Sequence, residues 1–311
     1  MNYEGQICRA PMERSSYMLP VTVGCPYNRC KFCNLFRHLK YRELPVSQIE
    51  EELKRVKALG GNPKRIFLGD GNAFGLKTER LLKILELIKS YFPGYEAVNM
   101  DATVTSILKK SDEDLKKLHE NGVRHLYLGI ESGLEDVLVY MNKDHNLQQA
   151  YEAIERLQNA GLIYDAHIMT GIAGHERGME NAEALAEFFN NTCPAHIVNF
   201  SMFLSKEVPL YQDIKNGDFK PADEVENMKE EYRLLELLTG ENASYKVKYD
   251  GFHDYIKVRT RGTLPDDRGR MLAHLKQEIK RFEGKNKMYS LVYGECPNLS
   301  KCDGNEDVWD V

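Results

Sequence analysis

The strongest constraint on the fold is a regular alternation of strand-like and helix-like segments between about residues 18 and 204. Short apolar runs alternate with longer segments of helical periodicity, and glycines close several of these helices. A Ser47–Glu50 capping box is expected to open the first helix. The six strands of this series are expected at residues 19–23, 65–68, 95–100, 125–128, 163–169 and 196–204.

This alternation is typical of a parallel sheet with helical crossovers. Six strand-then-helix units are too few for a closed eight-stranded barrel. The predicted fold class is therefore α/β, a partial (β/α)6 TIM-like barrel with a C-terminal α/β extension, and a doubly wound sheet is the alternative. The expected division is an N-terminal segment over 1–17, the barrel over 18–205, and an extension over 206–311 that helps to form the substrate pocket.

The extension has a different pattern from the barrel. Residues 223–238 and 268–282 are expected to form long helices. Residues 245–249 and 255–259 are expected to pair as strands.

Three of the seven cysteines, Cys25, Cys30 and Cys33, lie in one loop after the first strand. Three thiolates on a compact turn can hold three corners of a cubane iron–sulfur cluster. Because no fourth cysteine is near, one iron would remain open for chemistry. A structural zinc site is the alternative, but zinc usually takes four ligands and no further ligand has a suitable spacing. This cysteine usage favours a reducing cytoplasm over a disulfide framework.

Three polar or glycine-rich segments follow later strands, where parallel α/β sheets place their functional loops. They are Gly69–Asn72, Gly129–Gly133 and Ile168–Glu176. An Asx turn at Asp70 and a helix N-terminal acid at Glu131 are the structural alternatives to a functional role.

The spacing Cys-x4-Cys-x2-Cys, with Phe32 before the last cysteine, resembles the radical S-adenosylmethionine (SAM) enzymes over about residues 18–220. Most of that family space the first pair by three residues, so this chain has a minority variant. The resemblance implies that Cys25, Cys30 and Cys33 bind a [4Fe–4S] cluster whose fourth iron binds SAM. The reduced cluster of such enzymes cleaves SAM to a 5′-deoxyadenosyl radical, which abstracts hydrogen from a substrate.

The same resemblance implies a SAM site that is drawn from four loops. Asp70 stands where the family has a glycine, and His175 stands where many members have an acid, so the role of each side chain is open. The residues expected to contact SAM are Phe32, Gly69, Asp70, Gly71, Asn72, Glu131, Ser132, Gly171 and Gly174.

Other candidates follow from position alone. Asp101, His167 and Asn199 lie on expected barrel strands and are candidate catalytic residues. Lys257, Arg259 and Arg261 alternate along an expected strand and could form a phosphate or carboxylate clamp, or only an exposed cationic edge. Cys296 and Cys302 could help to hold a second metal, but are interpreted as ordinary thiols because no other ligand is near. Cys8 and Cys193 are expected to be packing residues.

The formal net charge of −5 disfavours long nucleic acid as a ligand and favours a small molecule or a nucleotide. The chain is also similar to the queuine salvage lyases, which implies release of queuine from queuosine 5′-phosphate. The alternatives are a radical SAM tRNA- or cofactor-modifying enzyme (methylthiolation or rearrangement) and a non-catalytic iron–sulfur or zinc protein. An electron donor such as flavodoxin or ferredoxin is the expected partner. No signal peptide or membrane span is expected, and the expected location is the cytoplasm.

Overall fold

The computed structural model describes residue 4, residues 8–239 and residues 246–292. The chain forms two compact units, which are described separately. The first comprises residues 1–129 and 144–166, and the second comprises residues 130–143 and 167–311. The chain passes between the units within strands β6 (Val123–Glu131) and β7 (Ile163–Thr170).

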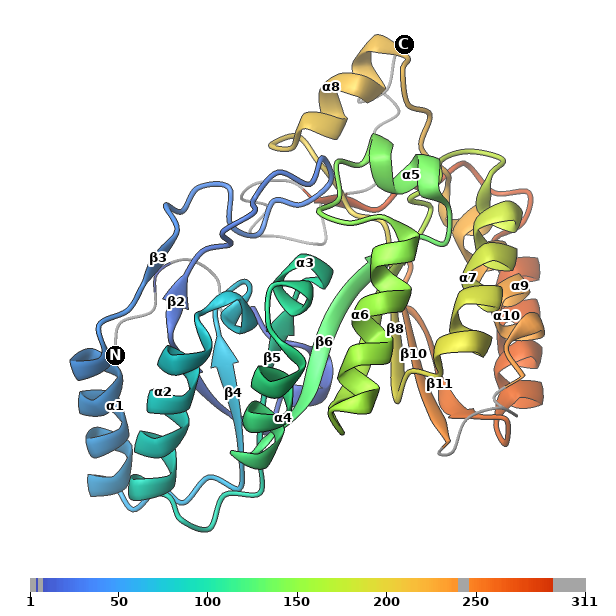
Figure 1. Ribbon diagram of the computed structural model, residues 1–311. Coiled ribbons are helices and arrows are strands. Elements are labelled where there is room, and N and C mark those ends of the chain that lie inside the picture. Colours follow the sequence, from blue (N-terminus) through green and yellow to red (C-terminus); the bar gives the residue numbers. More distant parts are fainter. Residues whose placement is uncertain (1–3, 5–7, 240–245, 293–311) are drawn as a thin grey trace. The chain divides into compact units, whose positions relative to one another are not determined.

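The first unit contains a parallel sheet that agrees with the predicted alternation (Figure 1). β1 (Tyr17–Pro20) pairs with β4 (Arg65–Gly69), β4 pairs with β5 (Ala97–Ala102), and β5 pairs with β6. A short antiparallel pair, β2 (Thr22–Val23) with β3 (Arg42–Glu43), brackets the cysteine loop. Most residues of β1, β4, β5 and β6 are buried, as the apolar runs predict.

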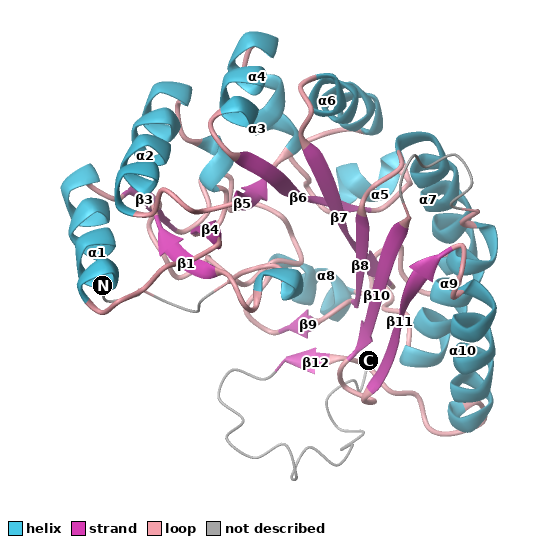
Figure 2. Ribbon diagram, turned by 90° about the horizontal axis from the view of Figure 1, so that it is seen from below, coloured by secondary structure: helices cyan, strands magenta, loops and turns pink. Residues whose placement is uncertain are grey.

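Helices follow the strands of this unit, and Figure 2 shows α1, α2, α4 and α6 on one side of the strands. Ser111 and Asn146 cap α4 and α6, because each side chain accepts a hydrogen bond from the third residue of its helix. The capping box at Ser47 is wrong: the helix begins at Val46 after Pro45, so Ser47 lies inside it. The helices are η1 (Pro11–Glu13), α1 (Val46–Ala58), η2 (Ala73–Gly75), α2 (Thr78–Tyr91), α3 (Val104–Leu108), α4 (Asp112–Glu120) and α6 (Leu147–Asn159).

The second unit contains β8 (His196–Ser201), which is parallel to β10 (Val247–His253), and β11 (Val258–Leu264), which is antiparallel to β10. A separate parallel pair joins β9 (Leu204–Ser205) and β12 (Leu291–Val292). Figure 2 shows α7, α9 and α10 on one side of β8, β10 and β11. The helices are α5 (Glu135–Tyr140), α7 (Gly178–Thr192), α8 (Pro209–Asn216), α9 (Glu224–Leu237) and α10 (Arg268–Phe282).

The parallel series is longer than the six strands that the sequence predicts. β10 is a further parallel strand beside β8, and α8 and α9 lie in the connection between them. The predicted pair of strands in the extension exists, but it covers 247–253 and 258–264. In β10 the exposed Lys248 alternates with buried neighbours, a pattern that is also typical of a hairpin at the protein surface. The sequence therefore does not indicate that β10 pairs with a strand of the parallel series.

No helix among the described residues is long and apolar enough to cross a membrane.

Candidate active site

The cysteine loop occupies the connection between β2 and β3. Its three cysteines, Cys25, Cys30 and Cys33, are half-buried and form no disulfide with one another. Arg37 fixes the loop, because its guanidinium donates to the carbonyl of Cys33 at 2.7 Å and also to that of Cys30. Asn28, whose φ is 46°, donates its side-chain amide to the carbonyl of Phe36 at 2.9 Å. Phe32 is buried within the same loop.

The segment Gly69–Asn72 packs directly against the cysteine loop. Gly71 has a φ of 58°, and a Cβ atom there would overlap the carbonyl oxygen of Gly24 and lie 3.0 Å from the Cα of Cys25. Thr22 also holds the segment, because its hydroxyl donates to the Asp70 carbonyl at 2.7 Å and accepts from the Asp70 amide at 3.2 Å. Only glycine provides both this backbone conformation and this approach. The two motifs therefore form one surface, as their predicted positions imply.

Two acids lie near this surface, at the ends of neighbouring strands. Burial raises the pKa of Asp70 from 3.8 to about 6. Burial, with the charges of Asp70 and Glu13, raises the pKa of Asp101 from 3.8 to about 8. Asn72 has a structural role, because it donates to Thr103 Oγ1 at 3.1 Å and accepts from Gly75 N at 3.0 Å.

The sequence does not indicate that Cys8 lies near the acids Asp70 and Asp101 and near Cys33. Burial, together with the charges of Asp70, Asp101 and Cys33, raises the pKa of the Cys8 thiol to about 12. This thiol therefore lies within electrostatic reach of the site and is held in its neutral form. Its separation in sequence from the motif provided no signal for this proximity.

These residues fit a cluster with a bound SAM. The Asp70 carboxylate is buried, and its Oδ1 has no hydrogen-bond partner among the described residues, so it is suited to an ammonium group. Among the described residues, no group of three or more His, Cys, Asp or Glu side chains is arranged so that it could hold a single metal ion. A cubane cluster does not need such a group, because each cysteine binds a different iron.

In the second unit, the last residue of β6 and the residue after it are two of the predicted SAM contacts. Glu131 has a φ of 66° and is buried, and its carboxylate accepts from Lys143 Nζ at 3.2 Å. The Ser132 hydroxyl donates to Asn181 Oδ1 at 2.6 Å and is fully buried. The Ser132 side chain therefore holds the loop itself.

The segment after β7 forms a glycine turn. Gly171 and Gly174 both have a φ of 85°, and Gly174 N donates to the Gly171 carbonyl at 3.0 Å. Glu230 of α9 accepts from Gly171 N at 2.8 Å. His175, whose role the sequence left open, contacts Glu226 of α9 through Nδ1 at 2.7 Å.

The two candidate catalytic residues of this unit have different surroundings. Burial and the charges of His196 and Lys143 lower the pKa of His167 to about 4, so its imidazole is neutral near pH 7. The ring of His167 meets Phe200 edge-on, with centroids 6.1 Å apart. Asn199 is fully buried, and its Oδ1 accepts from Thr170 N at 3.0 Å. This contact favours a positioning role for Asn199 over a catalytic one.

Two of the three residues predicted to form an anion clamp lie together on one strand. Arg259 and Arg261 share one face of β11, and both contact Asp250 Oδ1, at 3.1 and 2.6 Å. Lys257 precedes the strand, in the turn after β10, with a φ of 57°, so it is wrong to place it in the same strand row. Cys296 and Cys302 lie outside the described residues.

The predicted site residues thus form two sets. The first unit holds the cysteine loop, the Gly69–Asn72 segment and Asp101, whereas the second holds Glu131, Ser132, the glycine turn, His167, Asn199 and the β11 arginines.

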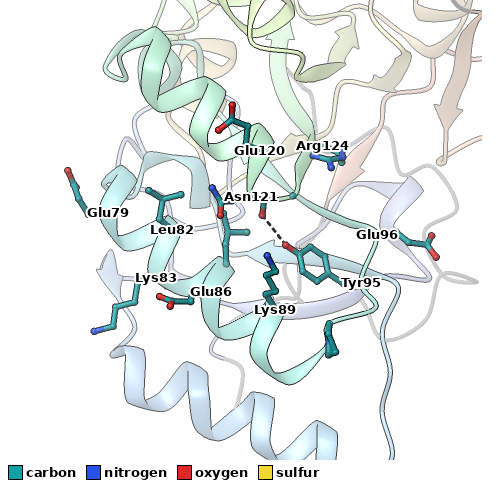
Figure 3. A pocket seen from close by; sticks show the side chains of 13 residues that line it. Glu79, Leu82, Lys83, Glu86, Lys89, Tyr95, Glu96, Glu120, Asn121 and Arg124 are labelled. Atoms are coloured by element: carbon teal, nitrogen blue, oxygen red, sulfur yellow. Dashed lines mark hydrogen bonds between the residues drawn. The ribbon is translucent and has the colours of Figure 1, made fainter.

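A separate recess of about 930 Å³ in the first unit has a different character (Figure 3). It lies at the amino ends of β5 and β6, because Tyr95, Glu96, Asn121 and Gly122 immediately precede these strands. The Tyr95 hydroxyl donates to the Asn121 carbonyl there at 2.9 Å. The predicted site loops follow the carboxyl ends of the strands, so this recess is not the candidate site.

Comparison with known proteins identifies the family of the chain. Residues 19–189 match the Radical SAM superfamily. A curated relative, the heme chaperone HemW of Bacillus subtilis, is 22% identical over 234 residues, which are 73% of this chain and 58% of HemW. The chain spans about three fifths of the length of such relatives.

Two solved structures share the fold. Coproporphyrinogen III oxidase (HemN) of Escherichia coli has a TM-score of 0.55 at 12% identity, covering 72% of this chain and 52% of HemN. Methylornithine synthase (PylB) has a TM-score of 0.52 at 16% identity, covering 71% of this chain and 61% of PylB.

The chain belongs to the radical SAM superfamily. The predicted fold class is confirmed, because its α/β fold with parallel strands matches partial TIM barrels of that family. The predicted cofactors, a [4Fe–4S] cluster and SAM, are those of the superfamily.

Proposed function

We propose that this chain holds a [4Fe–4S] cluster on Cys25, Cys30 and Cys33, cleaves SAM reductively, and directs the radical chemistry at a small anionic substrate. The proposed reaction is release of queuine from queuosine 5′-phosphate. The main supporting observation is the packing of Gly71 onto Gly24 and Cys25, next to Asp70, whose buried Oδ1 has no hydrogen-bond partner in the part of the chain that the structure describes.

The residues of the chain have separate roles in this proposal. The three thiolates would hold the cluster, which supplies the electron for SAM cleavage when it is bound. Asp70 would accept hydrogen bonds from the SAM ammonium, and Glu131 would do the same for the ammonium or the ribose hydroxyls. The turn that contains Gly171 and Gly174 would lie beside the adenine ring. A flavodoxin or ferredoxin in the cytoplasm would supply the electron.

One face of the second unit supports a flat, anionic substrate. Phe200 and Phe252 are paired across β8 and β10, with centroids 5.2 Å apart and planes 20° apart. The Arg259 guanidinium lies 4.3 Å from the Phe252 ring centroid. Aromatic faces bind heterocyclic bases, and guanidinium groups bind phosphate. Asp250 holds both arginines in place, so a phosphate would have to share them with this carboxylate.

The cluster assignment is tested by the Cys30→Ala variant. Anaerobically reconstituted Cys30→Ala is expected to lose the cluster and SAM cleavage, because one iron loses its protein ligand. Iron and sulfide analysis and 5′-deoxyadenosine formation measure the two losses. Cys193→Ala, at the end of α7, is the control and should retain both properties. Normal 5′-deoxyadenosine formation by Cys30→Ala would refute the assignment.

The substrate assignment needs a second assay. Queuine release from queuosine 5′-phosphate should require the cluster, SAM and a reductant, and Arg259→Ala should raise KM for the phosphorylated substrate more than it lowers kcat. No queuine above the enzyme-free control would end this assignment. Tight tRNA binding that weakens steeply with salt would instead favour a tRNA-modifying enzyme.

A further inference from the structure

Helix α9 lies beyond the segment that matches the superfamily, yet it contacts one of the predicted SAM loops directly. Glu230 of α9 is buried, and each of its oxygens has a different partner. Oε2 accepts from Gly171 N at 2.8 Å, and Oε1 accepts from Asn181 Nδ2 at 2.7 Å. One carboxylate therefore joins the glycine turn after β7 to helix α7.

Asn181 extends this connection to the other predicted SAM loop. Its Oδ1 accepts from the Ser132 hydroxyl at 2.6 Å and from Gly133 N at 3.1 Å. The Ser132 hydroxyl also accepts from Leu134 N at 3.1 Å. A continuous path of hydrogen bonds thus runs from Gly171 through Glu230 and Asn181 to Ser132 and Gly133. The side chains of Glu230, Asn181 and Ser132 are all buried.

Close packing leaves these loops little freedom to move apart. A Cβ atom on Gly133 would lie 2.5 Å from the backbone of Ala184 and Leu185 in α7. A Cβ atom on Gly171 would lie 2.5 Å from Asn227 Oδ1 in α9. Each loop is therefore held against a helix at a glycine, and the Glu230–Asn181 pair joins the two helices.

We infer that Glu230, acting through Asn181, is a positioning residue that holds the Glu131–Gly133 loop and the Gly171–Gly174 turn in one arrangement for SAM. This inference rests on the proposed function of the two loops. Buried N–H donors are costly to leave unpaired, so the loops and the Glu230 side chain must move together.

The two donors at this position suit the two oxygens of a carboxylate. Both neighbours of Glu230 are N–H donors, and a carboxylate has two acceptor oxygens. A glutamine would keep one acceptor, but it would place its own N–H groups against the second donor. Glu230→Gln therefore breaks one link while almost preserving the volume of the side chain.

The test compares Glu230→Gln with the matched control Glu236→Gln. Glu236 lies on the same helix, is exposed, and pairs with Arg233. Hydrogen exchange of the apoprotein should become faster in both 130–134 and 170–174 in Glu230→Gln and in neither segment in the control. On the reconstituted protein, SAM should bind about tenfold more weakly to Glu230→Gln. Its kcat at saturating SAM should stay close to that of the wild type.

Several outcomes decide the inference. Faster exchange in only one of the two segments, or unchanged SAM affinity, would overturn it. If Glu230→Gln does not fold, Glu230→Asp keeps the charge and shortens the reach, and the same two measurements apply to it. If the wild type binds no SAM, the proposed function has failed. Hydrogen exchange still decides the structural part of the inference, because Glu230 couples the two segments only if exchange becomes faster in both of them in Glu230→Gln.

Discussion

Asp70 and Asp101 show how the surroundings of a residue change its chemistry. Both are ordinary aspartates in the sequence, yet burial raises both pKa values, to about 6 and about 8. Each pKa lies above the value of 3.8 for a free side chain. The folded protein therefore binds protons more tightly than the unfolded chain at these positions, and stability contributed by the neutral acids is lost as the pH rises.

The raised pKa of Asp101 leads to a prediction for the Asp101→Asn variant. Between about pH 4 and pH 8 the unfolded wild-type chain is ionised at Asp101, whereas the folded apoprotein still holds the proton there. The stability of the wild type therefore falls as the pH rises through this range, and the variant lacks this contribution. Asp101→Asn should therefore raise Tm at pH 8.5 by about 2–4 °C or more, and should have little effect at pH 4.5. Thermal unfolding followed by circular dichroism measures both values. Asp254→Asn, at an exposed turn position, is the control; an equal gain in Tm at both pH values would contradict the explanation.

At the scale of elements, the candidate site depends on how two loops pack. Gly24 and Cys25 of the cysteine loop meet Gly71 of the segment after β4 at a distance that excludes a side chain. Thr22 of β2 and Asp70 secure the same junction by hydrogen bonds. The position of the thiols therefore depends on a strand that follows them by about forty residues in the sequence.

Gly71→Ala should displace the cysteine loop. Its Cβ would overlap the Gly24 carbonyl, so the iron bound per chain after reconstitution should fall to less than about half of the wild-type value. Gly60→Ala is the matched control, because Gly60 also has a positive φ of 78° but has no atom within 4 Å of an added Cβ. The control should lose about 1 kcal/mol of stability and keep its iron. Equal iron contents in the two variants would show that the contact does not matter.

At the scale of the whole chain, the residues after the barrel form part of the main architecture. β10 extends the parallel strands beside β8, and α9 packs on the outward face of these strands. His253 of β10 is buried between two glutamates of α9, with Nδ1 2.8 Å from Glu224 and Nε2 2.8 Å from Glu231. The two carboxylates outweigh burial and raise the pKa of His253 to about 10.

His253 should make stability depend on pH above neutrality. Because its pKa is raised from 6.5, its contribution is complete below about pH 6.5 and is lost as the pH approaches 10. His253→Gln should lower the free energy of unfolding at pH 6.5 by about 3–5 kcal/mol and flatten its decline toward pH 10. Urea unfolding at several pH values measures this. His274→Gln on α10 is the control, and an unchanged decline in His253→Gln would refute the assignment.

Much of the fold could be predicted from local pattern. Apolar runs identified β1, β4, β5, β6, β7 and β8, but gave no signal for the short strand β3. The Ser47 cap failed because Pro45 already begins the turn. The pairing of β10 with β8 could not be predicted, because the alternation of polar and buried residues in β10 does not identify a partner.

The sequence by itself determined the family, the cofactors and the cysteine loop, because ligand type and spacing are local properties of the chain. Only the tertiary structure decided that Cys8 lies within electrostatic reach of the acids, that Arg259 and Arg261 share Asp250, and that Glu230 reaches Gly171. Those relations depend on which distant segments become neighbours. They are decided by packing and by the need to pair buried polar groups, neither of which can be read from residue spacing.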